Sequence, residues 1–298
     1  MGFVQHRHPF TPYDRAPAGD AAAFRAMPIR DDMLPPPPDG EFRHRVGVRP
    51  LDLAEWLPVD EETEPTIAMK RALLAERRDE VVACASGGEA AAEEAAGLVA
   101  DWRGASLERN GIDALVEAAL LVADDLTVLG PVDGDGGAPR FVAGVVCAPS
   151  RWSLRSKMGR TMLETHGPVP RYAEHIGAAV DTLLRRLSAD RPVWRSNWTL
   201  VDHPALFQPE VPDGPLVDDP SQLWVRMERE TLRRLPRTGG ILFTIRGFQQ
   251  PLPEYVARGR EHARIVRDLV ARLPDDVARY KSVLPHRAAV SAWLDACC

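Results

Sequence analysis

The sequence predicts an α+β fold in which one antiparallel sheet of five strands carries inserted helices. Short apolar runs bounded by turn residues indicate strands at 126–129, 141–147, 193–201, 223–235 and 241–248. Apolar residues at helical spacing indicate helices between the second and third of these runs, at 154–158 and 172–187. The order of two strands, helices and three strands is the topology of PAS domains, whose sheet curves around a ligand.

Length, composition and charge limit the classes of protein. The chain has 298 residues, 45% of them hydrophobic, which is enough for a substantial core. Its formal net charge of −6 argues against a nucleic-acid partner, which requires a basic surface. No run approaches the roughly 20 apolar residues that span a bilayer, and no signal core follows the N-terminus. We therefore expect a cytoplasmic protein without a membrane partner.

Composition divides the chain into two parts. Residues 1–50 are rich in Pro, Arg and Asp and include the run Pro35-Pro-Pro-Pro38, which predicts an extended N-terminal arm. Residues 51–298 are expected to form a single PAS-like domain with helical additions at about 66–123 and 254–295. The spacing of apolar residues predicts three helices in the first addition.

The last three strands each carry a polar face when alternate residues are sorted. One interpretation is that these faces meet water, as in many antiparallel sheets. The other is a polar concave pocket, in which arginines bind carboxylates and Glu228 or Glu230 holds a cationic group. The alternation alone does not decide between them. The residues concerned are Arg195, Asn197 and Thr199, then Arg226, Glu228 and Glu230, then Thr244 and Arg246.

His166 is the candidate metal ligand. It lies between a short helix-like turn and a long amphipathic helix, with Pro168 and Pro170 close behind it, so its imidazole can be held in a fixed direction. The alternative roles are a helix cap or an exposed loop histidine. The four cysteines form no Cys-x-x-Cys pair, which disfavours an iron–sulfur cluster carried by this chain.

Several runs, in this order along the chain, together resemble the haem-dependent oxidative N-demethylase family. The resemblance covers roughly residues 45–294 and is densest over 141–252. The runs are Pro149-Ser-Arg-Trp-Ser-Leu154, Lys157-Met-Gly-Arg160, His166-Gly-Pro-Val-Pro170 with Tyr172, Val193-Trp-Arg-Ser-Asn-Trp198, Leu206-Phe-Gln-Pro209, Trp224-Val-Arg-Met-Glu-Arg-Glu-Thr-Leu-Arg-Arg-Leu-Pro236 and Ile241-Leu-Phe-Thr-Ile-Arg246.

This resemblance implies an activity and a cofactor. Haem b would lie in the concavity of a PAS-like sheet, and the protein would oxidatively demethylate a small secondary methylamine such as dimethylamine, using O2 and two electrons and releasing formaldehyde. The chain has no Gly-x-Gly-x-x-Gly fingerprint, so electrons, ultimately from NADPH, would come through a separate flavin and iron–sulfur reductase. The arginine-rich segment 226–237 would either dock that acidic partner or form a solvated strand edge.

The resemblance also suggests roles for residues. His166 would be the axial haem ligand, and Arg195, Arg226 and Arg246 would contact the haem propionates. The catalytic candidates are Asn197, bonding to bound oxygen or substrate, and Glu228, attracting a dimethylammonium ion. Trp198 would add a cation–π contact, and its alternative role is core packing. The alternative role of Asn197 is a hydrogen bond to a neighbouring loop. A non-catalytic PAS-like haem or small-ligand sensor is the alternative function.

Overall fold

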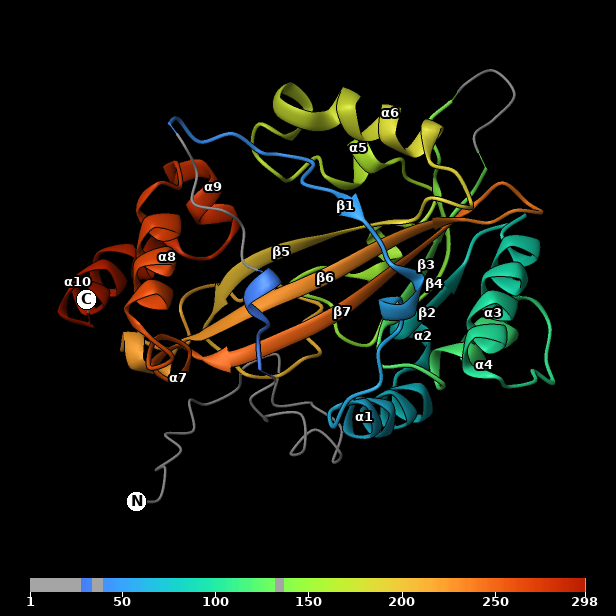
Figure 1. Ribbon diagram of the computed structural model, residues 1–298, viewed down its shortest axis with the longest axis horizontal. Coiled ribbons are helices and arrows are strands. Elements are labelled where there is room, and N and C mark those ends of the chain that lie inside the picture. Colours follow the sequence, from blue (N-terminus) through green and yellow to red (C-terminus); the bar gives the residue numbers. More distant parts are fainter. Residues whose placement is uncertain (1–27, 34–39, 132–136, 298) are drawn as a thin grey trace.

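The computed structural model describes residues 28–33, 40–131 and 137–297 (Figure 1). Within these ranges the predicted combination of helices with one antiparallel sheet is confirmed. Most of the predicted N-terminal arm, 1–27 and 34–39, lies outside the described residues. In the described part of the arm, Asp31–Met33 form a 3₁₀ turn, and residues 42–48 run without helix or strand into the first strand of the sheet.

The sheet has seven strands among the described residues, in the order β1-β5-β6-β7-β3-β4-β2. Its five inner strands are those that the sequence predicts, but the predicted total of five was wrong. The two added edge strands are only two and three residues long, too short to show period-two alternation. The strands are β1 (Arg49–Pro50), β2 (Val82–Cys84), β3 (Asp125–Leu129), β4 (Phe141–Val145), β5 (Val193–Val201), β6 (Trp224–Arg234) and β7 (Ile241–Pro251).

The helices form three groups around the sheet (Figure 1). The first group packs at one end of the strands and beneath the sheet, the second lies over one face, and the third lies at the opposite end. In chain order they are α1 (Thr63–Glu76), α2 (Arg78–Val81), α3 (Glu89–Arg103) and α4 (Gly111–Ala119), then α5 (Met162–Thr165), a π-helix (Ala173–Gly177) and α6 (Ala178–Arg186), then α7 (Leu252–Val256), α8 (Arg260–Ala271), α9 (Asp275–Tyr280) and α10 (Arg287–Cys297).

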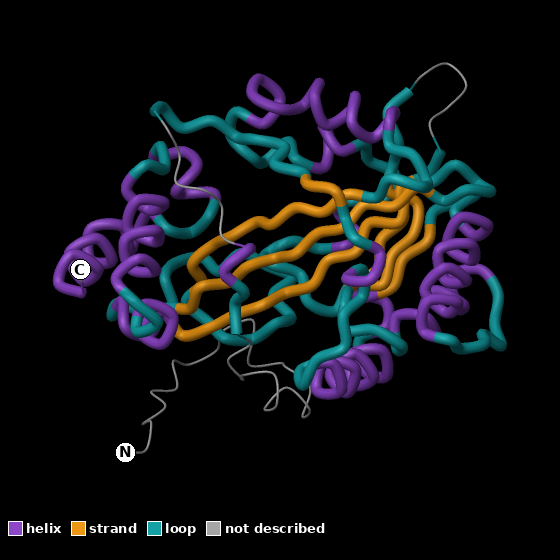
Figure 2. The backbone as a smooth tube through the Cα atoms, in the orientation of Figure 1, coloured by secondary structure: helices purple, strands orange, loops and turns teal. Residues whose placement is uncertain are grey.

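The second group is the one that matters for the site. We call residues 151–191, which include α5, the π-helix and α6, the helical layer. Figure 2 shows this layer above the twisted strands. It is the insertion predicted between the second and third inner strands, although the predicted helix at 154–158 is a 3₁₀ turn (Leu154–Ser156). α5 begins with a capping box in which the side chains and backbone amides of Thr161 and Glu164 bond reciprocally.

Two apolar clusters hold the layers together. The larger one joins helices α1, α3, α4, α7, α8 and α10 to the sheet, through residues such as Leu73, Leu115 and Val270. The smaller one joins the helical layer to β4, β6 and β7, with Met162 and Leu184 on the helices and Phe243 on the sheet. Burial of this smaller cluster fixes the height of the helical layer above the strands. In the described ranges, no helix has both the length and the apolar character needed to cross a bilayer.

The hairpin between β6 and β7 shows how turn residues set the register of the sheet. Gly239 adopts a φ of +75°, which favours glycine, and its N–H donates to the carbonyl of Leu235. A Cβ on Gly240 would stand 2.8 Å from the carbonyl oxygen of Leu129, so only glycine lets the hairpin approach β3. This register decides which side chains of the two long strands share a face.

Candidate functional site

A pocket lies between the helical layer and the face of the sheet formed by β5, β6 and β7. The space between its walls, counted together with the open solvent at its mouth, is about 440 Å³. Its walls are mostly aliphatic, from the π-helix and α6 on one side and from Leu232 and Phe243 on the other. Val46 and Val48, from the described part of the predicted arm, also line it.

His166 is in this pocket, at the C-terminal end of α5. Its Nδ1 lies 2.8 Å from the carbonyl oxygen of Met162. A carbonyl only accepts hydrogen bonds, so Nδ1 carries the proton of the neutral ring and Nε2 keeps its lone pair. Burial is the main reason that the pKa of His166 falls to about 4, and nearby Lys157 and Arg195 lower it further. At neutral pH the side chain is therefore an uncharged imidazole with one nitrogen available to a metal.

Tyr172 packs against the face of the His166 ring. The two rings are stacked, with centroids 4.4 Å apart and planes inclined by 6°. Tyr172 is buried, and burial raises the pKa of its hydroxyl to about 12. In the turn that joins His166 to Tyr172, Arg171 has a φ of +62°. The guanidinium of Arg171 pairs with Asp276 of α9 at 2.9 Å. The direction of the imidazole is thus fixed by a backbone bond, a stacked ring and an anchored turn.

Arg195 and Glu230 supply the charged groups of the pocket. They are direct partners on neighbouring strands, and Arg195 Nη1 donates to Glu230 Oε2 at 3.1 Å. Glu230 is only 8% exposed, and burial raises the pKa of its carboxyl although the adjacent guanidinium lowers it. Near His166, this polar face therefore lines a pocket, to which Arg195 and Glu230 both contribute.

Asn197 and Glu228, the predicted catalytic pair, lie two residues further along the same face and outside the pocket lining. They bond to each other, from Asn197 Nδ2 to Glu228 Oε2 at 3.2 Å. Lys281, just after α9, donates to Asn197 Oδ1 at 3.3 Å and to the carbonyl of Trp198 at 2.6 Å. Burial lowers the pKa of Lys281 to about 8, despite the opposing effect of Glu228.

Lys281 could not be found from the sequence, because its only signal is a charge at the end of a short helix. The tertiary structure brings it across more than 80 positions of chain to β5. It is also electrostatically coupled to Glu230, at the edge of the pocket. A hydrogen-bonded cluster of one lysine, one asparagine and one glutamate therefore borders the pocket.

The other predicted haem contacts lie away from the pocket. Trp198 is on the opposite face from Arg195 and packs against the larger apolar cluster, with Lys281 Nζ 5.2 Å from its ring. Arg246 pairs in register with Arg229, also on that opposite face, and its Nη2 contacts Asp60 at 2.8 Å. Neither residue lines the site of His166.

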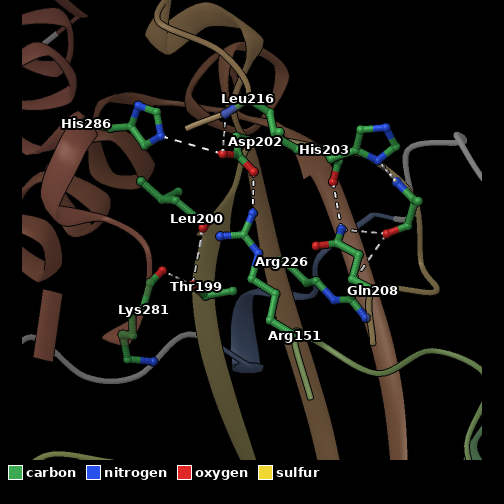
Figure 3. A network of polar contacts seen from close by, with 11 residues as sticks. Arg151, Thr199, Leu200, Asp202, His203, Gln208, Leu216, Arg226, Lys281 and His286 are labelled. Carbon is green, nitrogen blue, oxygen red and sulfur yellow. Dashed lines mark hydrogen bonds and ion pairs between the residues drawn. The ribbon is translucent and has the colours of Figure 1, made fainter. Parts of the chain in front are cut away.

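Arg226 is on the same face of the sheet as Arg195. It lies on β6, four residues before Glu230, the cross-strand partner of Arg195. It is fully buried, and its guanidinium donates to the carbonyl oxygens of Ala148 and Leu206 at 2.8 and 3.1 Å. Its place is beneath the connection that follows β5, beside Gln208 (Figure 3). Of the three predicted arginines, only Arg195 is found in the pocket lining.

A second polar cluster is centred on Asp202, at the end of β5 (Figure 3). Its carboxylate contacts Arg151 in an ion pair, accepts the N–H of Leu216 at 2.9 Å and lies 3.9 Å from His286 Nε2. Burial alone would raise the pKa of Asp202, but His286, Arg151 and the amide of Leu216 lower it to about 2. This cluster joins four distant parts of the chain and is structural.

The residues of the pocket fit a haem. His166 offers an imidazole nitrogen of the kind that binds haem iron, with the other nitrogen bonded as such ligands require. The aliphatic walls suit the apolar faces of a porphyrin, and Arg195 offers a guanidinium for a carboxylate. The comparison with protein families agrees: a model described as "haem-dependent oxidative N-demethylase, alpha subunit-like" matches residues 100–291, more than half of the chain.

Proposed function

Because the chain belongs to the haem-dependent oxidative N-demethylase, alpha subunit-like family, we propose that it binds haem b beside His166 and demethylates a small secondary amine such as dimethylamine. The observation that carries this proposal is the partly buried imidazole of His166, whose proton and ring plane are both fixed at the wall of a largely apolar pocket. The five inner strands would then serve as a PAS-like cup.

His166 is the proposed axial ligand. Its Nδ1–H bond to Met162 keeps Nε2 deprotonated, and its low pKa prevents competition by protons at neutral pH. Arg195 is the proposed contact for a propionate, since its guanidinium is at the pocket and a carboxylate can share it with Glu230. Arg226 and Arg246 have no part in this proposal because their guanidinium groups bond elsewhere.

When bound, the haem supplies the activation of O2 for oxidation of an N-methyl carbon. In the net reaction, the methylated amine, O2, two electrons and two protons give the demethylated amine, formaldehyde and water. The aliphatic walls exclude water from the reacting carbon. We assign attraction of the ammonium form of the substrate to Glu230 and not to Glu228, since Glu230 lines the pocket and Glu228 does not.

Glu228 and Asn197 keep a supporting role in the proposal. They hold Lys281, whose lowered pKa lets its ammonium release a proton near neutral pH, at the edge of the pocket. Electrons would come from a separate reductase, ultimately from NADPH. The alpha subunit-like family match supports a partner of this kind.

Two measurements on the purified protein test the proposal. Added haem should give a Soret band in a one-to-one complex, and the complex should release formaldehyde from dimethylamine with ascorbate and phenazine methosulfate as a small-molecule electron source. Absence of a Soret band would contradict haem binding. A Soret band without formaldehyde from any amine in a panel of secondary methylamines would favour the sensor function instead.

A further inference from the structure

The helical layer carries a charge opposite to that of the whole protein. Residues 151–191 contain eight Arg and Lys and four Asp and Glu, while the full chain has a formal net charge of −6. The helical layer also covers the pocket and contains His166. The segment that covers the proposed haem site is therefore net positive, in a protein that is net negative.

Several cations of the helical layer have no carboxylate partner. In the part of the chain that the structure describes, Arg155, Lys157, Arg160, Arg185 and Arg186 make no ion pair, whereas Arg140 pairs with Glu164 and Arg171 with Asp276. Arg155 donates from Nε to the carbonyl of Asp79 in α2 at 2.6 Å, whereas Arg160, Arg185 and Arg186 are exposed within the helical layer. Their charges are therefore available to an approaching molecule.

The helical layer also carries an exposed apolar residue. Leu163, on α5, is 43% exposed and is three positions before His166. Its far side packs near Gly177 of the π-helix. Protein–protein interfaces combine an apolar centre with a polar rim, so a layer that exposes both a leucine and unpaired arginines has the composition of an interface.

We propose that the outer surface of the helical layer, which carries Leu163, Arg160, Arg185 and Arg186, docks an acidic electron-carrier protein. This inference rests on the proposed function, because that reaction consumes two electrons. An electron that arrives at this surface enters next to His166, which is the short route to a group bound by its imidazole. Opposite charges orient the two proteins and speed their encounter.

The segment 226–237, which the sequence suggested for docking, is largely internal, although Arg237 at its end is exposed and pairs with Glu94. Arg226 and Arg229 are buried, and Arg229 donates to the carbonyl oxygens of Glu55 and Trp56. The guanidinium of Arg234 bonds to carbonyl oxygens at the end of α6, including that of Leu184. Most arginines of this basic run therefore form hydrogen bonds within the protein, and the proposed docking surface is in the helical layer.

The test is a stopped-flow measurement of haem reduction in the holoprotein under nitrogen, followed at the Soret band. The probe is a reduced plant-type [2Fe–2S] ferredoxin, which is acidic. For the unmodified protein, the second-order rate constant should fall as salt is raised, because the attraction is screened. In the double variant Arg160→Glu/Arg185→Glu it should fall by about tenfold or more at low salt and lose most of its salt dependence.

A matched variant separates this surface from net charge. Arg71→Glu/Arg260→Glu makes the same change of charge at exposed arginines of α1 and α8, outside the helical layer, and should leave the rate constant within about twofold of the unmodified protein. Equal slowing in the two double variants, or a rate independent of salt in the unmodified protein, would overturn the proposal.

Reduction by dithionite distinguishes a docking defect from a damaged haem site. It should proceed equally in all three proteins, since a small reductant needs no docking surface. If the rate constant with ferredoxin contradicts the expectation while the Soret band is intact, the docking surface is refuted and the demethylase proposal still stands. Loss of the Soret band in the unmodified protein would refute the proposed function itself.

Discussion

The rings of His166 and Tyr172 are stacked face to face, with centroids 4.4 Å apart and only 6° between their planes. Together with the bond from His166 Nδ1 to the carbonyl of Met162, this contact leaves the imidazole little freedom to rotate. A ligand that is already oriented loses less entropy when it binds a metal. These contacts therefore hold Nε2 of His166 in a fixed position at the pocket.

Removal of that nitrogen should remove the axial bond. We expect His166→Ala to lose or strongly shift the Soret band of the reconstituted protein, and added imidazole to restore it in part. His262→Ala is the matched control, because His262 contacts Asp31 and lies outside the pocket lining. Identical spectra of His166→Ala and the unmodified protein would show that iron is held by another group.

Removal of the stacked ring should loosen the ligand without removing it. Tyr172→Phe keeps the stack and should leave haem affinity within about twofold, whereas Tyr172→Leu should weaken it up to about tenfold, since such ring pairs contribute about 0.5–1.5 kcal/mol. Haem transfer to apomyoglobin, followed at the Soret band, measures the difference. Equal loss in both variants would assign the effect to the hydroxyl instead of the ring.

The carboxylate of Glu230 should act on substrate binding. We expect Glu230→Gln to raise KM for dimethylamine about tenfold or more, with a smaller change in kcat, because an attraction made equally to substrate and transition state mainly sets KM. Glu228→Gln is the comparison on the same face outside the pocket. A larger rise in KM for Glu228→Gln would return the cation-binding role to that residue.

Acid should destabilise the haem-free protein through His166. Its folded-state pKa of about 4 is below the ordinary value of 6.5, so the unfolded chain binds more protons between these values. Stability is therefore lost as pH falls from about 6.5 to about 4, by about 2–3 kcal/mol from this residue. Urea titrations at several pH values should show a flatter profile for His166→Gln, and an unchanged slope would contradict a buried neutral imidazole.

Asp202 should contribute stability in a lower pH range. Its folded-state pKa of about 2 lies below the ordinary value of 3.8, so its contribution is complete above about pH 4 and is lost as pH falls towards 2. Asp202→Asn should cost about 2 kcal/mol at pH 7, and the difference from the unmodified protein should vanish near pH 2. Exposed Asp218→Asn is the control, expected to change stability by less than about 0.5 kcal/mol.

The sequence by itself determined the elements of the fold and the identity of the axial candidate. Short apolar runs bounded by turn residues are a local property, so they identified all five inner strands, and the turn around His166 was visible from its prolines and its neighbouring helix. The same reasoning missed β1 and β2, because two or three residues carry no period.

Only the tertiary structure decided which polar groups meet. Alternation shows that a strand has a polar face, but the face itself depends on register, and a shift of one residue reverses it. The register puts Arg195 beside Glu230 in the pocket and Arg246 on the other side of the sheet. Lys281, which follows α9, bonds to Asn197, Trp198 and Thr199 of β5, and these contacts join residues too distant in the chain for any local pattern to record.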